Sequence, residues 1–148
     1  MAQMAKIEDK TQIMCAPPKV YNFFKNDLTE LTKIVPQLFQ SVKVIDGNKG
    51  QAGGVIQYEL LILGKAMTAK VKTEAINDEE KSISFVILEG DIMELYKSFK
   101  AKVTVGDGTA MWCLEFEKAN DSAPNPDQYA TLAVEITKGL DLYLLNSI

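Results

Sequence analysis

The sequence predicts an α+β fold in which a curved, seven-stranded antiparallel sheet holds one long C-terminal helix across its concave face. The helix is predicted because residues 126–148 repeat apolar side chains at helical spacing. The sheet is predicted because most of the preceding chain alternates apolar and polar residues, as half-buried strands do. Tight-turn signals such as Gly106-Asp107-Gly108 separate these strands, and strands joined by tight turns are antiparallel.

The C-terminal helix is predicted to begin at Asn125 and Pro126, a capping side chain followed by a proline that suits the first helical turn. At this length it spans about 30 Å, the width of a small domain, and cannot bury an apolar face on itself. Glu135, Lys138 and Asp141 lie on its polar face. Its apolar face comprises Tyr129, Leu132, Ala133, Ile136, Leu140, Tyr143 and Leu144.

The N-terminal part is predicted to form one strand and two short helices. The strand covers residues 5–15, and the two prolines that end it suit the first turn of a helix at residues 19–26. A second short helix covers residues 28–35 and ends at Pro36, because a proline disfavours the helical conformation of the residue before it. The other six strands are predicted at residues 42–45, 55–63, 66–76, 82–89, 96–105 and 109–118.

The loop at residues 46–54 carries four glycines and has two interpretations. It is either a flexible turn between antiparallel strands or a phosphate cradle. The Gly-Lys-Ser/Thr ending of a nucleotide-binding loop is missing and no helix is expected to follow, which favours the turn. No repeat or domain boundary interrupts the chain, so residues 1–148 are expected to form a single domain.

The composition describes a soluble globular protein, with 47% hydrophobic and 24% charged residues. A net charge of −4 argues against nucleic acid or an anionic membrane as the partner. No apolar run approaches the ~20 residues of a membrane span, and the first residues lack the apolar core of a secretory signal. Cys15 and Cys113 are therefore expected to be reduced thiols of a cytoplasmic protein, which we expect to be a monomer or weak dimer.

The chain has no histidine. Catalytic triads with a histidine base, histidine-ligated zinc sites and histidine pH switches are therefore excluded. Acid–base chemistry would have to come from Asp, Glu, Tyr, Lys or Cys, and neither a metal nor a cofactor is expected.

The order of one strand, two short helices, six strands and one long helix resembles that of the plant Bet v I / START-like superfamily, a helix-grip fold. Local motifs resemble its major latex protein (MLP) family. Glu89-Gly90-Asp91 with the YKSF at residues 96–99 resembles the EGD…YKSF signature, and the WCLEFEK at residues 112–118 resembles a W-x-L-E-Y-E-K strand. The glycine loop departs from the family, because GQAGGVIQ replaces a longer G-x-x-G-x-V-x-x-W pattern.

This resemblance implies an internal cavity that binds a hydrophobic small molecule, such as a plant terpenoid or alkaloid. It also implies an alternative, because some members are cofactor-independent cyclases or isomerases of specialised metabolism. A third hypothesis, a nuclease-like defence protein, is disfavoured by the negative charge and the missing histidine.

Inward-facing residues are expected to line a ligand cavity of about 300–1,000 Å³ between the sheet and the long helix. Small residues leave room for a ligand, and methionines adapt to varied ligand shapes. The ligand-binding candidates are Phe24, Leu31, Val35, Leu61, Met67, Ala69, Phe85, Ile87, Phe99, Ala101, Met111, Cys113, Leu132, Ala133, Ile136 and Leu140.

The strand at residues 55–63 leaves two catalytic candidates open. If Val55 and Leu61 face inward, so does Glu59, and burial would raise its pKa and make it a general acid or base. If the strand has the opposite orientation, Tyr58 faces inward and Glu59 is solvated. Cys113 is expected to be an inert thiol, because no histidine is present to activate it.

Overall fold

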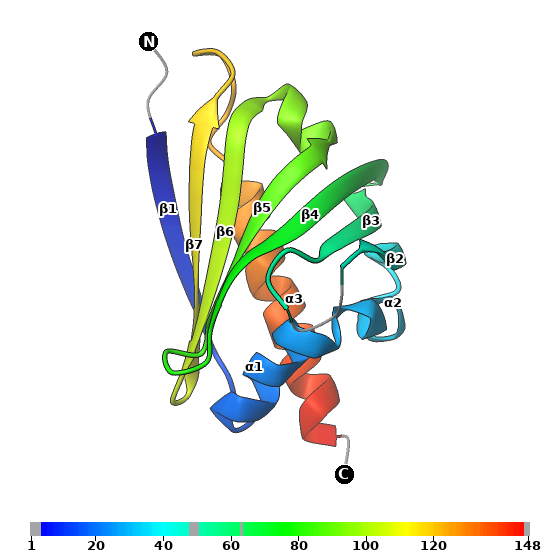
Figure 1. Ribbon diagram of the computed structural model, residues 1–148, viewed down its shortest axis with the longest axis vertical. Helices are drawn as coiled ribbons and strands as arrows, with labels where there is room; N and C mark the ends of the chain where they lie inside the picture. The colour runs from blue at the N-terminus through cyan, green and yellow to red at the C-terminus, as the bar shows by residue number, and fades with distance from the viewer. Residues whose placement is uncertain (1–3, 48–50, 63, 147–148) are drawn as a thin grey trace.

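The structure is a computed structural model that describes residues 4–47, 51–62 and 64–146. Seven strands form one antiparallel sheet in the order β1-β7-β6-β5-β4-β3-β2, and Figure 1 shows the long helix α3 running across the sheet. The predicted fold class is confirmed. The elements are β1 (Met4–Gln12), α1 (Pro17–Asn26), η1 (Leu28–Glu30), α2 (Leu31–Ile34), β2 (Phe39–Asp46), β3 (Val55–Ile62), β4 (Lys65–Asn77), β5 (Ser82–Gly90), η2 (Asp91–Glu94), β6 (Tyr96–Gly106), β7 (Thr109–Lys118) and α3 (Asp127–Asn146).

The first two strands lie at opposite edges of the sheet, although they are neighbours in sequence. The segment α1–η1–α2 makes this crossing and contacts α3 on the way (Figure 1). Tyr21 of α1 donates a hydrogen bond to the Asp78 carboxylate at 2.5 Å, which ties the helix to the β4–β5 turn. The two short helices therefore close one end of the space between the sheet and α3.

The middle of α3 is held to the sheet by a buried chain of hydrogen bonds. Trp112 Nε1 of β7 donates to Thr137 Oγ1 at 2.8 Å, and this hydroxyl donates to the Ala133 carbonyl oxygen at 2.8 Å. Each group in the chain has a partner, so the helix can lie over an apolar interior without leaving a buried donor unpaired.

We expect Thr137→Val to destabilise the fold by about 1–3 kcal/mol, because the shape is kept but the buried Trp112 N–H loses its acceptor. Urea unfolding followed by Trp112 fluorescence measures this loss. Thr131→Val is the matched control, since Thr131 lies on the exposed face of the same helix and should change stability by less than about 0.5 kcal/mol. Equal losses of stability for the two substitutions would contradict the role of the Thr137 hydroxyl as the acceptor for Trp112.

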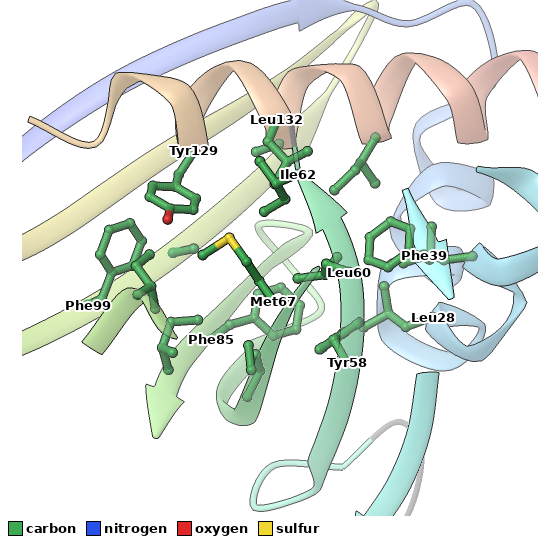
Figure 2. Close-up of a pocket in the computed structure, with 18 of the residues that line it drawn as sticks. Leu28, Phe39, Tyr58, Leu60, Ile62, Met67, Phe85, Phe99, Tyr129 and Leu132 are labelled. Atoms are coloured by element: carbon green, nitrogen blue, oxygen red, sulfur yellow. The ribbon is translucent and has the colours of Figure 1, made fainter. Parts of the chain in front are cut away.

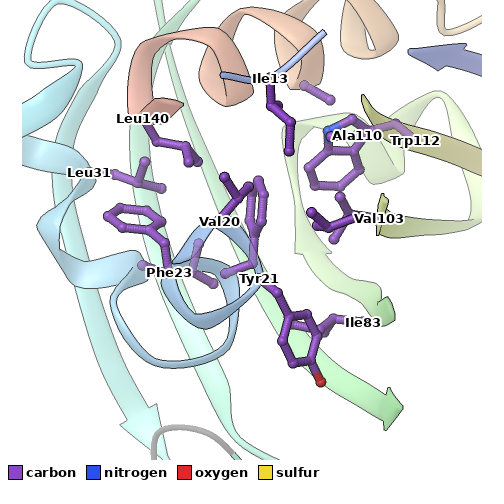
Figure 3. Packing of buried hydrophobic residues seen from close by; sticks show 14 of the residues in the cluster. Ile13, Val20, Tyr21, Phe23, Leu31, Ile83, Val103, Ala110, Trp112 and Leu140 are labelled. Carbon is purple, nitrogen blue, oxygen red and sulfur yellow. The ribbon is translucent and has the colours of Figure 1, made fainter. Parts of the chain in front are cut away.

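Two clusters of buried side chains form the core. The larger one joins α1, α2 and the C-terminal half of α3 to the sheet, and Figure 3 shows Val20, Leu31 and Leu140 meeting there. The smaller one surrounds Tyr96 and Phe99 beneath the start of α3. The Tyr96 hydroxyl donates to the Pro124 carbonyl oxygen at 2.6 Å and anchors the segment that leads into the helix. The space between the two clusters is bounded by the sheet and α3.

Some element boundaries and one helix face differ from the predictions. The second strand begins at Phe39 rather than at residue 42, and the turn after Gly90 is a short 3-10 helix. Asp141, predicted on the polar face of the last helix, is buried. Tyr143, predicted on its apolar face, is exposed. The predicted parts at residues 48–50, 63 and 147–148 lie outside the described residues.

Candidate functional site: an apolar cavity between the sheet and the long helix

A partly open cavity of about 190 Å³ lies between the two core clusters, bounded by the concave face of the sheet, α1, η1, α2 and α3 (Figure 2). Its wall includes the small side chains of Ala69 and Ala101 from the sheet and Ala133 from the helix, which leave room between the two layers. Its lining residues are Phe24, Leu28, Leu31, Phe39, Tyr58, Leu60, Ile62, Met67, Thr68, Ala69, Val71, Phe85, Ile87, Ile92, Phe99, Ala101, Trp112, Leu114, Tyr129, Leu132, Ala133 and Ile136.

The cavity is smaller than the 300–1,000 Å³ that the sequence led us to expect. Aromatic rings fill much of the space. Phe24 packs edge-on against Trp112 with ring centroids 5.4 Å apart, and Phe39 lies 5.8 Å from Tyr58. A cavity of about 150 Å³ is large enough for benzene, so this one accommodates a compact molecule of roughly ten non-hydrogen atoms.

Most of the sequence-predicted ligand-binding candidates line this cavity. They come from α1, α2, three strands of the sheet (β4, β5 and β6) and α3, which lie far apart in the sequence. The candidates in the cavity wall are Phe24, Leu31, Met67, Ala69, Phe85, Ile87, Phe99, Ala101, Leu132, Ala133 and Ile136.

The predicted inward orientation of Met111 and Cys113 is wrong. Strand β7 carries apolar residues on both faces, and it is Trp112 and Leu114 that face the interior, while Met111 is 40% exposed. The glutamates at positions 115 and 117 share the outer face with Cys113, a signal in the sequence that favours the observed orientation.

Burial, with the nearby Glu8 and Glu115 carboxylates, raises the pKa of the Cys113 thiol, which therefore stays protonated at neutral pH.

Three further candidates lie outside the cavity. Leu61 belongs to the outer face of β3, because its neighbours Leu60 and Ile62 line the cavity. Val35 and Leu140 are buried but contribute to the larger core cluster instead, where Val35 also contacts Gly139 of α3. Both were predicted from helical spacing, which marks a buried face but does not separate packed core from cavity wall.

The orientation of β3 decides between the two catalytic candidates. Tyr58 pairs with Ala69, and Leu60 with Met67, so Tyr58 shares the inner face with these cavity residues. Glu59 lies on the other face and is exposed. The hypothesis of a buried Glu59 carboxyl is therefore wrong, because the hydrogen-bonding register with β4 turns that side chain outward.

The Tyr58 side chain is buried, with 9% of its surface exposed. Burial alone raises the pKa of its hydroxyl above the usual value, and no hydrogen bond from this hydroxyl is found among the described residues. The oxygen is nonetheless not sealed within packed atoms, since no fully enclosed side-chain oxygen or nitrogen in the described parts of the chain lacks a partner. The Tyr58 side chain is part of the cavity wall.

The three other polar side chains of the wall are already occupied or lie at its margin. Thr68 of β4 is exposed. The Trp112 N–H donates to Thr137, as described above. Tyr129, in the first turn of α3, is only half-buried and packs edge-on against Phe99 with centroids 6.0 Å apart. Figure 2 shows Tyr58 and Tyr129 on opposite sides of the cavity. Tyr58 is therefore the deeply placed hydroxyl in an otherwise carbon-rich wall.

Sequence reasoning missed several wall residues. Phe39 was missed because the second strand begins earlier than predicted, and Leu60 because the orientation of the third strand was left open. Ile92 was missed because it lies in the unpredicted 3-10 helix η2. The wall residues absent from the candidate list are Leu28, Phe39, Leu60, Ile62, Thr68, Val71, Ile92, Trp112, Leu114 and Tyr129.

Two features are absent from the described residues. No cluster of three or more Cys, Asp or Glu side chains that would hold a metal ion is found in them. No helix in the described part of the chain combines the length and the apolar character needed to cross a membrane. Both cysteines are free thiols.

Comparison with known proteins matches the whole length of the chain. The sequence profile of the pathogenesis-related protein Bet v 1 family matches residues 2–147. Major latex protein 149 from Papaver somniferum is 32% identical over 151 residues, covering 98% of this chain and 94% of that protein.

Solved structures share the fold. The crystal structure of major latex-like protein 151 from Panax ginseng matches with a TM-score of 0.91 and 26% identity, covering 95% of this chain and 97% of that chain. Norcoclaurine synthase from Thalictrum flavum matches with a TM-score of 0.77, covering 98% of this chain and 88% of that chain, but at 13% identity this is a likeness of fold alone. The family resemblance carried by the EGD, YKSF and WCLEFEK motifs is confirmed, and the chain belongs to the Bet v 1 family and, within it, to the major latex proteins.

Proposed function

We propose that this protein is a cytosolic binding protein that encloses a hydrophobic plant metabolite of the terpenoid or alkaloid type in the cavity beneath α3. The observation that carries the proposal is the cavity itself: about 190 Å³ of space surrounded almost entirely by aliphatic and aromatic side chains. Removing a small apolar molecule from water into such a space is favourable by about 25 cal/mol for each Å² of its buried surface. The free thiols of Cys15 and Cys113 support a reducing compartment.

Native mass spectrometry after incubation with a plant metabolite extract tests this proposal. We expect the protein to retain one apolar compound and its melting temperature to rise, because a ligand that binds only the folded state stabilises it. Retention of none from the extract, together with an unchanged melting temperature, would contradict the proposal.

A variant that fills the cavity sharpens the test. We expect Ala101→Leu to weaken retention of the compound by about tenfold or more, because the larger side chain occupies the space between β6 and α3. Ala75→Leu is the matched control, since Ala75 is exposed and outside the cavity wall, and it should bind as the unchanged protein does. Equal binding by both variants would show that the compound is held elsewhere.

The second candidate function is a cofactor-independent cyclase or isomerase that uses the same cavity. The Tyr58 hydroxyl favours it, because a hydrogen-bond donor inside an apolar enclosure can stabilise charge that develops on a bound carbonyl. The enclosure would hold a flexible substrate in one folded shape, which lowers the entropic part of the barrier. Conversion of a compound from the extract into a product of equal mass, measured by chromatography, separates this candidate from a binder.

A further inference from the structure

We propose that Tyr58 selects the ligand of this cavity, and that the ligand is a compact, mostly carbon molecule with a carbonyl or similar hydrogen-bond acceptor placed to meet the Tyr58 hydroxyl. The inference rests on the proposed binding function and deepens it. It names the ligand's size and its one polar requirement, which the apolar wall alone does not specify.

The size follows from the volume of the cavity. At about 190 Å³ it is only moderately larger than the ~150 Å³ that holds benzene. Phe24, Phe85 and Trp112 form a packed aromatic group on one side, with Phe85 and Trp112 stacked at 6.5 Å, so the wall does not expand there without breaking these contacts. A molecule of roughly ten non-hydrogen atoms fits within this volume, whereas a four-ring steroid would extend beyond it.

The polar requirement follows from the state of the Tyr58 hydroxyl. The side chain is buried, but its oxygen keeps some accessible surface and has no hydrogen-bond partner among the described residues, so it is free to pair with a molecule in the cavity. Because burial raises its pKa, the phenol is neutral at physiological pH and offers a proton to an acceptor. A pure hydrocarbon in the cavity would leave this donor unpaired, whereas a carbonyl oxygen would pair with it.

The placement of Tyr58 is built into the sheet. Its strand β3 is paired on both sides, with Tyr58 opposite Val42 of β2 and Ala69 of β4. The Phe39 ring lies against the Tyr58 ring with centroids 5.8 Å apart and restricts its movement. Ala69, the residue paired with Tyr58 on β4, is small and also lines the cavity. The hydroxyl is thus held in position before any ligand arrives, which lowers the entropic cost of the hydrogen bond.

Acetophenone and α-methylstyrene test the proposal, because they have the same shape and differ only in a carbonyl oxygen against a methylene group. Dissociation constants are measured by NMR titration of the full chain. We expect the unchanged protein to prefer acetophenone, and Tyr58→Phe to weaken acetophenone binding by about tenfold while leaving α-methylstyrene binding unchanged. Tyr143→Phe, at an exposed tyrosine outside the cavity wall, is the control and should change neither constant.

Each of the other possible outcomes contradicts a specific part of the proposal. If α-methylstyrene binds and Tyr58→Phe leaves acetophenone unaffected, the role of Tyr58 is wrong but the apolar binding function stands. If Tyr129→Phe rather than Tyr58→Phe removes the preference, the anchor is misassigned. If progesterone binds as tightly as acetophenone, the size limit is wrong. If neither small probe binds the unchanged protein, the proposed function fails together with the inference.

Discussion

Replacing Gly90 by alanine is expected to destabilise the protein by about 3 kcal/mol or more. Gly90 has φ of 136° and ψ of 178°, a region that only glycine occupies without strain. A Cβ atom there would collide with the Thr68 carbonyl oxygen and lie 2.8 Å from the Ala69 Cα. Both neighbours are backbone atoms of the paired strand β4, which cannot move aside as a flexible side chain can.

Gly90→Ala should weaken ligand binding in the cavity as well as lower the stability of the fold. Directly after Gly90, the Asp91 carboxylate accepts a hydrogen bond from the Thr68 backbone N–H at 2.7 Å, beside the cavity residues Met67 and Ala69. Displacing this segment moves the β4 part of the wall. Urea unfolding gives the loss of stability, and the acetophenone titration gives the loss of binding.

Gly108→Ala is the matched control. Gly108 also has a positive φ, of 72°, but no atom lies within 4 Å of the position that a Cβ would take. Only the backbone cost of the left-handed conformation remains there, about 1 kcal/mol. Similar losses for the two substitutions would show that the close approach to β4 is unimportant.

The second large effect is expected at Asp141, near the C-terminal end of α3. Its two carboxylate oxygens accept hydrogen bonds from the backbone N–H groups of Met14, at 2.8 Å, and Cys15, at 3.0 Å. These residues lie between β1 and α1, so the carboxylate joins the two ends of the chain. Asp141→Ala leaves two backbone donors without a partner and should cost about 3 kcal/mol in the free energy of unfolding.

Asp141→Asn distinguishes these hydrogen bonds from packing. The amide has one oxygen acceptor, so one backbone donor keeps a partner and roughly half of the loss should remain. Glu135→Ala, on the exposed face of the same helix, is the control and should stay within about 0.5 kcal/mol. Urea unfolding with unchanged m-values measures all three, and a loss below about 1 kcal/mol for Asp141→Ala would contradict the assignment.

The sequence by itself determined the order of elements and the fold class. Alternation in strands such as β5 and β6, and the turn at Gly106-Asp107-Gly108, are local properties that neighbouring segments do not override. For the same reason, the motifs that identify the family can be recognised in the sequence alone. The inward orientation of Phe85, Phe99 and Ala101 on the concave face was also predicted correctly.

Only the tertiary structure decided which face of β3 turns inward, why Asp141 is buried, and how large the cavity is. Strand β3 carries apolar residues on both faces, so the alternation of its sequence does not show which face is inward, and the pairing with β4 places Tyr58 there. In β7 the sequence does hold a signal, because Glu115 and Glu117 mark the outer face. The chain between β1 and α1 wraps the polar side of α3 and covers Asp141. The cavity volume is the space left after aromatic rings from distant segments have packed together. It depends on many contacts between segments, so no single segment of the sequence predicts it.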